Sequence, residues 1–405
     1  MKFWKQLSHP HWMVIAILLL ASVIRLFYFF FVFNPSSLPA NDCLEYDLIA
    51  RSIVDGKGYV LDDQPTAFRA PLLSFLMAGV YWIFGKNYVF ARLMVVGFSI
   101  ALVLSIYGLG RHVGNHYIGL WSAFLAAIWI HFVLYGSNLF TEIPYTFFAI
   151  TSIVFVIQYL KNAQIIYLLL TAFSLALAIL ARPVGIFLSL IVLLYLFMRL
   201  KGWRNVSRTV ILGVFILIFV FPWIYRNYLV FQRIIPVSTA GGTVLWISNN
   251  HYVAHHPLRW GFYVGYEQLP GAEKLISSDE IVRSDYAMHY TWNFIKNYPE
   301  DIPILIWNKA KRFWAPEVFT YSPRRWMIEG SYIILLLLAM GGIGLAIGLK
   351  MSGQKWLWII VLANFLPALI YWSGPRIRLP AEPTLLVFAA IFIDNFWKKL
   401  CRKKS

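Results

Sequence analysis

The sequence carries little charge for its length. Of its 405 residues, only 13% are Asp, Glu, Lys or Arg, whereas soluble domains carry roughly 25%. Hydrophobic residues make up 60% of the chain. This composition excludes a water-soluble globule and a disordered chain, and it predicts an all-α polytopic membrane protein.

Cysteine and several common enzyme motifs are scarce or missing. The two cysteines, Cys43 and Cys401, lie near opposite ends of the chain without metal-ligand spacing, so we expect neither a structural disulfide nor a cysteine zinc site. The sequence contains no GxxxxGK[ST] loop, no GxSxG elbow and no HExxH motif. It therefore gives no support for a nucleotide-binding loop or for a serine or zinc hydrolase.

Acidic residues are outnumbered: 18 Asp and Glu stand against 35 Lys and Arg, for a formal net charge of +17. Such a surplus can indicate a nucleic-acid partner. In a membrane protein, however, basic residues gather in cytoplasmic loops and face anionic lipid headgroups. We therefore interpret the charge as a sign of topology, and we expect membrane lipids and no nucleic acid as partners.

About ten segments approach the roughly 20 apolar residues that span a bilayer. They are Trp12–Phe33, Phe90–Gly110, Tyr117–Leu134, Pro144–Leu160, Ile165–Leu180, Val184–Leu200, Val210–Tyr228, Ile328–Leu349, Trp356–Trp372 and Pro383–Trp397. A further segment, Pro71–Phe84, is too short. If it lies in the outer interface, the basic tail Lys398–Lys404 faces the cytoplasm, as the positive-inside rule requires; if it crosses, that tail lies outside. We predict the interfacial placement.

Two long loops then lie on the outer side, Asn34–Arg69 and Val230–Met327. The chain divides into an N-terminal transmembrane module with the candidate catalytic residues (1–229), a large outer loop (230–327), and C-terminal helices with a basic cytoplasmic tail (328–405). Within the large loop, Trp292–Phe313 reads as an interfacial helix broken at Pro299 and Pro303. The first span is too long for a cleaved signal peptide and is expected to stay as an anchor.

Two acidic residues lie at the outer ends of predicted spans. Asp42 follows the first span and Glu142 precedes the fourth, so both are expected at the same membrane depth. Carboxylates flanked by apolar chain are candidates for a general base, a metal ligand or a hydroxyl anchor. The alternatives are a solvated loop acid for Asp42 and, for Glu142, a helix N-terminal acid that the helix dipole stabilises.

Five arginines also lie on the outer side, against the positive-inside bias. They are Arg69, Arg182, Arg226, Arg376 and Arg378. Any one of them alone could extend to outer-leaflet headgroups. Several at one depth indicate an anion site, most simply a phosphate held by guanidinium groups. Arg25 lies within the first span, where it needs a partner or a wet cavity, and we assign it no role.

Three histidines, His251, His255 and His256, cluster in the large outer loop. An HxxxHH pattern with no acid nearby in the sequence is weak support for a metal ion, so we interpret it as loop structure.

Short motifs stand along almost the whole chain, from near residue 12 to near residue 397. They are Asp42 with Tyr46 and Ala50, Thr66–Leu72, Phe84-Gly85, Ala91–Leu93, Thr141-Glu142, Ala181–Pro183, Pro222-Trp223 with Arg226–Tyr228, Leu245-Trp246 with Asn249-Asn250, and Arg378–Pro380 with Pro383. In this order they resemble the C-type superfamily of membrane glycosyltransferases, and more narrowly the family of the protein O-mannosyltransferases and the lipid A aminoarabinose transferase.

The resemblance implies a hexosyl- or pentosyltransferase that moves a sugar from a polyprenyl-phosphate donor to a lipid, glycan or protein acceptor, with inversion. It implies a multi-pass protein of the plasma (inner) membrane with its active site on the outer face. Asp42 would be the catalytic carboxylate and Glu142 the second acid. Donor phosphate or sugar would contact Tyr46, Arg69, Arg182, Arg376 and Arg378. No cofactor is required, although two acids could bind a divalent cation.

The sequence departs from the family pattern in two ways. Cys43 stands where a second acid is frequent, so the acid pair there is incomplete, and we expect none of the extra C-terminal spans or the soluble domain that some relatives add. The resemblance therefore leaves the acceptor open. Two other functions also stay open. A transporter or flippase of lipid-linked sugars predicts charges at mid-membrane and paired broken helices, whereas the polar residues here gather at the outer surface. A catalytically inactive relative need not keep Asp42, Glu142 and Arg69 together.

Overall fold

The computed structural model describes residues 11–199, 203–256, 260–273, 279–316 and 325–402. These residues are helical apart from loops and one antiparallel pair of two-residue strands, in which Val60 faces Pro65 and Leu61 faces Gln64. The predicted all-α class is confirmed.

The elements of the first half are α2 (His11–Phe27), η1 (Tyr28–Val32), α3 (Asp42–Val54), β1 (Val60–Leu61), β2 (Gln64–Pro65), α4 (Pro71–Phe84), α5 (Tyr88–Val113), α6 (His116–Ile128), α7 (Ile130–Gly136), α8 (Glu142–Asn162), α9 (Ile165–Ala181), α10 (Gly185–Arg199) and α11 (Trp203–Phe231). Those of the second half are α12 (Gly241–Ser248), α13 (His251–His255), η2 (Tyr266–Gln268), α15 (Glu280–Asn297), α16 (Asp301–Trp314), α17 (Arg325–Gly348), α18 (Gln354–Ile370), α19 (Pro375–Arg378), η3 (Leu379–Ala381) and α20 (Glu382–Arg402).

Within the described residues, five helical segments are long and apolar enough to cross a membrane. They are Trp12–Val32, Tyr88–Val113, Glu142–Asn162, Val206–Phe231 and Trp326–Gly348. The pair α6 and α7, bent by 54°, passes the same test as one broken span. Helices α4, α9, α10 and α18 are apolar but shorter, at 10–17 residues. The chain is therefore a multi-pass membrane protein, and the predicted count of ten spans is not confirmed.

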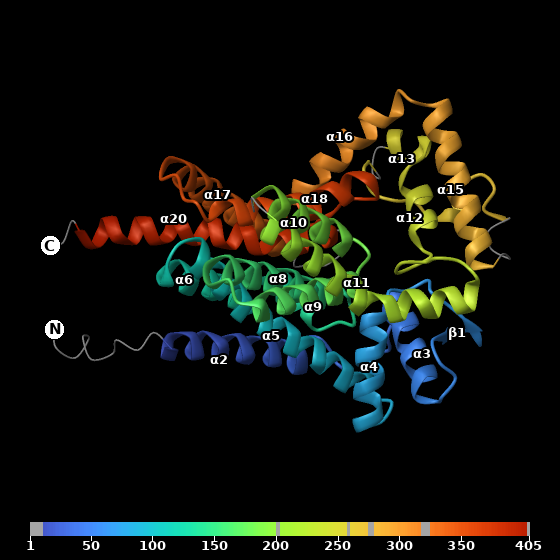
Figure 1. Cartoon of the computed structure of the whole chain (residues 1–405), viewed down its shortest axis with the longest axis horizontal. Helices are drawn as coiled ribbons and strands as arrows, with labels where there is room; N and C mark the ends of the chain where they lie inside the picture. Colours follow the sequence, from blue (N-terminus) through green and yellow to red (C-terminus); the bar gives the residue numbers. More distant parts are fainter. Residues whose placement is uncertain (1–10, 200–202, 257–259, 274–278, 317–324, 403–405) are drawn as a thin grey trace.

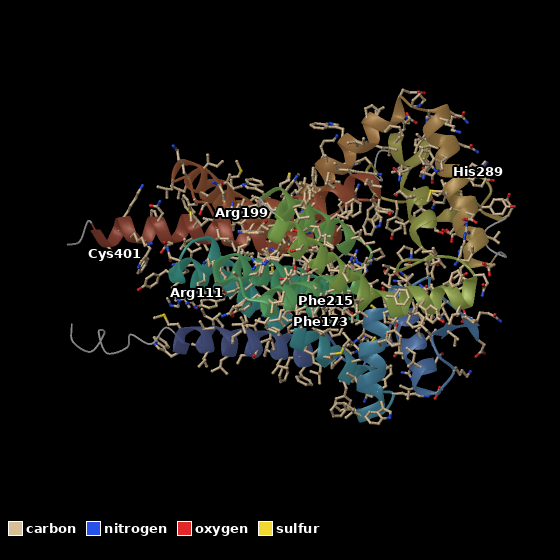
Figure 2. The ribbon with its side chains drawn as sticks, in the orientation of Figure 1. Arg111, Phe173, Arg199, Phe215, His289 and Cys401 are labelled. Atoms are coloured by element: carbon tan, nitrogen blue, oxygen red, sulfur yellow. The ribbon has the colours of Figure 1, made fainter. Side chains whose placement is uncertain are left out.

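The helices form two parts (Figure 1). The long helices, α2, α5, α8 and α20 among them, run side by side along the long axis of the molecule, and α2 begins at the same end of this bundle at which α20 finishes. At the other end stand α12, α13, α15 and α16, which we call the outer module after the topology predicted from the sequence. In Figure 2, Arg111 lies toward the bundle end that holds Cys401, whereas His289 lies in the outer module.

Helix α4 has the features of an interfacial helix. Its 14 residues run across the bundle axis in Figure 1 instead of along it. Near its end, Trp82 is 81% exposed and Ile83 is 65% exposed, which suits a lipid-water boundary where tryptophan is enriched. This orientation supports the prediction that Pro71–Phe84 does not cross the membrane.

The predicted helix at Trp292–Phe313 needs correction. The chain does break around Pro299, between α15 and α16, but Pro303 lies inside α16, which begins at Asp301. Proline is tolerated in the first turn of a helix because the N–H groups there have no intrahelical acceptor. The second predicted break is therefore wrong.

Arg25 finds its partners at the break between α6 and α7. Its guanidinium group donates to the carbonyl oxygens of Ala127 at 2.8 Å and Ala126 at 3.1 Å, and to the hydroxyl of Ser99 at 2.8 Å. A broken helix leaves carbonyl groups without intrahelical donors, which is costly inside a membrane. Arg25 thus stabilises the broken span, and its role is structural.

Candidate active site

Helix α3 presents two carboxylates at the point where the chain leaves the first span. Asp42 is the first residue of α3 and Glu45 lies in its first turn. Residues three apart share one face of a helix, and the N-terminal end of the helix dipole favours negative charge. Sequence reasoning named Asp42 but missed Glu45, although the i, i+3 spacing was available as a signal.

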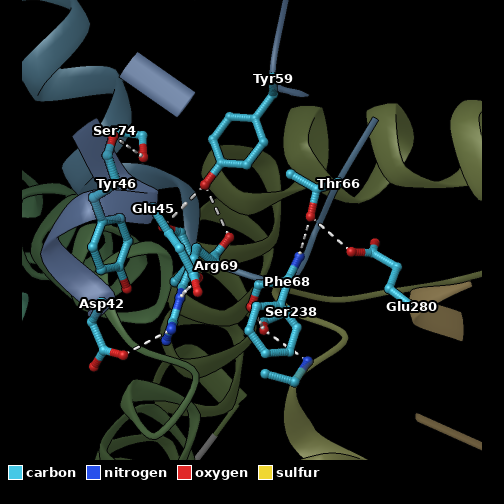
Figure 3. Close-up of polar contacts among 12 residues, drawn as sticks. Asp42, Glu45, Tyr46, Tyr59, Thr66, Phe68, Arg69, Ser74, Ser238 and Glu280 are labelled. Carbon is cyan, nitrogen blue, oxygen red and sulfur yellow. Dashed lines mark hydrogen bonds and ion pairs between the residues drawn. The ribbon is translucent and has the colours of Figure 1, made fainter. Parts of the chain in front are cut away.

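Arg69, just before α4, bridges these two acids (Figure 3). Its Nη2 donates to Asp42 Oδ1 at 2.8 Å, and its Nε donates to Glu45. The guanidinium group also lies over the aromatic rings of Phe68 and Tyr46, at 5.0 and 5.8 Å from the ring centroids. Burial raises the pKa of Tyr46 to about 12, so its phenol keeps its proton at neutral pH.

Arg376, on the short helix α19, joins the two acids predicted from the sequence. Its Nη2 lies 3.0 Å from Asp42 Oδ2, and its Nε donates to Glu142 Oε1. Helices α3, α8 and α19 meet here although they are far apart along the chain. The predicted proximity of Asp42 and Glu142 is therefore seen in the structure, with a guanidinium group between them.

Glu142 also pairs with Arg182, which follows α9. Arg182 Nη1 donates to Glu142 Oε1 and to the Thr141 hydroxyl at 3.2 Å. The contacts form one alternating series, which we call the ion-pair row. In order it consists of Glu45, Arg69, Asp42, Arg376, Glu142 and Arg182.

The two predicted catalytic acids differ in access to solvent. The Asp42 side chain is 29% exposed, whereas that of Glu142 is fully buried at 0%. Burial raises the pKa of Asp42, but the guanidinium groups of Arg69 and Arg376 outweigh it and hold the pKa below its ordinary value. Asp42 is thus ionised and accessible to a substrate, whereas the buried Glu142 pairs with the guanidinium groups of Arg182 and Arg376.

The structure does not bring Arg378 into the ion-pair row. Its side chain is fully buried and donates to the Phe313 carbonyl at 3.0 Å, to the Ala315 carbonyl, and to Glu382 at 3.2 Å. We therefore leave it out of the proposed phosphate site. Arg226 is likewise engaged with backbone, since it donates to the Thr66 and Tyr59 carbonyl oxygens.

A largely apolar groove of about 570 Å³ lies beside the loop that carries Arg69. Its walls include Tyr59, Phe75, Leu180 and Trp223. The Tyr59 hydroxyl donates to the Arg69 carbonyl at 3.0 Å, so the groove and the ion-pair row share one structural element.

In the described residues, the acids of the ion-pair row do not form a group of three close metal ligands. Both oxygens of Asp42 face guanidinium nitrogens. The arrangement therefore resembles an anion site whose positive groups are held in place by carboxylates.

Comparison with known proteins bears on the family resemblance and the fold. Residues 63–225, less than half of the chain, match the family model described as dolichyl-phosphate-mannose-protein mannosyltransferase. No curated protein matches the chain significantly. The oligosaccharyltransferase of Archaeoglobus fulgidus, in its apo form, superimposes with a TM-score of 0.61 at 14% identity, over 99% of this chain and 52% of that protein. The fold is that of the C-type membrane glycosyltransferases.

The resemblance predicted from the sequence is thus confirmed, and the chain spans about half the length of the oligosaccharyltransferase. The same archaeal protein, AglB, in complex with an inhibitory peptide and a dolichol-phosphate, gives a TM-score of 0.61 at 14% identity over 96% and 51% of the two chains. ArnT from Cupriavidus metallidurans bound to undecaprenyl phosphate gives 0.47 at 13% identity over 95% and 77%. The family model covers Arg69, Glu142 and Arg182.

Proposed function

We propose that the protein is a glycosyltransferase that takes one sugar, a hexose or a pentose, from a polyprenyl-phosphate donor at the outer face of the plasma membrane. The ion-pair row carries this proposal. The row brings three arginines together at the end of the bundle opposite the basic C-terminal tail. A phosphate-linked donor would bind there. The acceptor is a lipid, a glycan or a protein.

Donor phosphate would compete with carboxylates for the guanidinium groups of Arg69 and Arg376. Both are partly exposed, at 20% and 28%, so a phosphate can reach them. When the anomeric carbon–oxygen bond breaks, negative charge grows on the departing polyprenyl phosphate. Guanidinium groups fixed in a low-dielectric mouth stabilise that charge most strongly in the transition state.

The apolar groove supports a lipid-linked donor. It lies against α4 and α11, and its lining residue Tyr59 donates to the Arg69 carbonyl. A prenyl chain in the groove would place its phosphate within reach of Arg69. AglB, which has the same fold, is known in complex with a dolichol-phosphate, and this is further support for a donor of that class.

Asp42 would act on the acceptor. Its carboxylate takes the proton of the acceptor hydroxyl as that oxygen forms the new bond to the anomeric carbon, on the face opposite the leaving phosphate. Polyprenyl phosphate departs with the electron pair, and the sugar is inverted. While Arg69 and Arg376 are paired to Asp42, its low pKa makes it a weak base. Phosphate binding would divert those arginines and raise the basicity of Asp42 when the reactants are in place.

We propose no metal within this site, because guanidinium groups already supply the positive charge next to both oxygens of Asp42. AglB is also known in complex with Zn and sulfate.

The test uses the full chain in lipid with a panel of polyprenyl-phosphate sugars and a crude envelope acceptor extract. We expect wild type to release free polyprenyl phosphate from one donor class and Asp42→Asn to release none. Asp63→Asn is the matched control, because Asp63 lies in the same outer loop, is 79% exposed and pairs only with Lys57 within the described contacts.

Release by Asp42→Asn at the wild-type rate would remove Asp42 from catalysis. If no donor is consumed but lipid-linked sugars cross vesicle bilayers, the protein is a transporter. If neither occurs with well-folded protein, it is an inactive relative.

A further inference from the structure

The outer module contains a group of side chains that the proposed reaction does not use. His251 and His255 lie one turn apart on α13, and their ring centroids are 4.5 Å apart. Asp301 begins α16 and lies against both rings, although it is 50 and 46 residues further along the chain. The fold thus brings an acid beside two histidines that have none nearby in the sequence.

Each of the three side chains offers a ligand atom close to those of the other two, and the two histidines contact different oxygens of Asp301. His251 Nδ1 lies 2.8 Å from Asp301 Oδ2, and His255 Nε2 lies 2.7 Å from Asp301 Oδ1. All the ligand atoms lie within 4.8 Å of one another. In the part of the chain that the structure describes, this is the one group of three or more such ligands.

One ligand of the group is buried and the other two are open to solvent. The Asp301 side chain is 3% exposed, whereas those of His251 and His255 are 63% and 47% exposed. A buried carboxylate needs a positive or hydrogen-bonding partner. The half-exposed imidazoles leave a route for an ion from solvent and room for water as a further ligand.

We propose that His251, His255 and Asp301 bind one divalent transition metal ion of the zinc type. Two imidazole nitrogens and one carboxylate oxygen are ligands that Zn²⁺ accepts, with water in the fourth position. The same set fits other ions that prefer imidazole, whereas Mg²⁺ and Ca²⁺ prefer sites made of oxygen alone. This proposal is independent of the proposed transferase function.

Little movement would admit the ion. Zinc–ligand distances of about 2.0–2.1 Å in tetrahedral geometry put ligand atoms roughly 3.4 Å apart. The nitrogen–oxygen contacts of 2.7 and 2.8 Å would have to open by about 0.6–0.7 Å, and any wider separation among the ligand atoms, which all lie within 4.8 Å, would have to close. Rotation of the two exposed imidazoles on a short helix can supply such changes. Without a metal, the same contacts are hydrogen bonds from imidazole N–H groups to the carboxylate.

The position of the site indicates what the metal does. It ties α13 to the first residue of α16. The other end of α16 accepts hydrogen bonds from Arg378, which shares the short helix α19 with Arg376 of the ion-pair row. A metal that fixes α16 would therefore hold the outer module against the element that carries Arg376.

The test titrates Zn²⁺ into chelator-treated full-length protein in detergent, prepared without a histidine tag and followed by competition with a fluorescent chelator. We expect one tight site per chain in wild type and a metal-dependent rise in thermal stability. Loss of a residue that only supports a ligand already costs about 10–100-fold in affinity. We therefore expect on the order of 100-fold loss for His255→Gln and for Asp301→Asn.

His289→Gln is the matched control, because His289 lies in the outer module on α15 and contacts Asn293 instead of Asp301. It should bind Zn²⁺ as wild type does. Zinc-edge X-ray absorption should show nitrogen and oxygen ligands only. Because Asp301→Asn could unfold the outer module, His255→Gln with a wild-type elution profile decides the question. Equal affinity in His255→Gln and wild type, or no tight site in wild type, would overturn the proposal.

Discussion

Helix α19 supplies one arginine to each of two carboxylate networks, and the two differ mainly in access. Arg376 belongs to the ion-pair row, whose Asp42 is 29% exposed. Arg378 belongs to a second network, which we call the inner network. It consists of Trp129, His131, Tyr332, Arg378 and Glu382.

The inner network is sealed. Glu382 and Arg378 are both 0% exposed, and Glu382 accepts from Trp129 at 2.7 Å and contacts His131 Nδ1 at 2.8 Å. The Arg378 guanidinium lies 3.5 Å from the centroid of the Tyr332 ring. A substrate phosphate has no access there, whereas the ion-pair row leaves its arginines open. Arginine–carboxylate pairs therefore stabilise the fold in the inner network and form a candidate binding site in the ion-pair row.

The largest expected effect comes from breaking the inner network. Arg378→Met leaves Glu382 without its arginine and leaves the Phe313 and Ala315 carbonyls without a donor. Removal of one partner of a buried ion pair costs about 3–5 kcal/mol. We expect a large loss of thermal stability in detergent, with poor yield of folded protein. Wild-type stability of Arg378→Met would mean that the inner network contributes nothing to the fold.

The matched change in the ion-pair row is Arg376→Met, two residues earlier on the same helix. Asp42 and Glu142 keep Arg69 and Arg182 as partners, so we expect near-wild-type thermal stability. Loss of a group that stabilises transition-state charge costs about 10²–10³-fold in rate. We expect kcat/KM for the donor to fall by about that factor. A loss of stability equal to that of Arg378→Met, with kcat/KM unchanged in the folded fraction, would contradict the division between the networks.

The pH dependence sharpens the comparison further. Arg69 and Arg376 hold the pKa of Asp42 below its ordinary value, so Asp42 stays ionised down to about pH 4. The acid limb that Asp42 gives in donor kcat/KM should therefore lie below about pH 4 in wild type. Arg69→Gln removes one of these charges, and a neighbouring opposite charge typically lowers a carboxyl pKa by about 1–3 units. The limb should move to higher pH in Arg69→Gln and return in Arg69→Lys.

Several of these features were within reach of the sequence and others were not. The charge pattern of the loops predicted one membrane side for five residues, and the structure brings their side chains together. They are Asp42, Arg69, Glu142, Arg182 and Arg376. The sequence could not predict that Arg376 and Arg378 belong to different networks, because the direction in which each side chain leaves a four-residue helix depends on tertiary packing. Nor could it pair His251 with Asp301, since no periodicity links residues 50 positions apart.

The smallest predicted effect concerns the contact between the outer module and the ion-pair row. Glu280, at the start of α15, accepts from the Thr66 hydroxyl at 2.7 Å (Figure 3). It also accepts from the Ala67 N–H at 2.8 Å. Hydrogen bonds to charged groups contribute about 1.5–3 kcal/mol each before solvent screening, and Glu280 is only partly buried. We expect Glu280→Ala to speed hydrogen exchange at the Ala67 amide severalfold and to raise the KM for the donor modestly, because Ala67 lies two residues before Arg69.

The control is Glu300→Ala, a change of the same type at an exposed residue. Exchange at Ala67 that stays at the wild-type rate in Glu280→Ala would show that the outer module does not position Arg69.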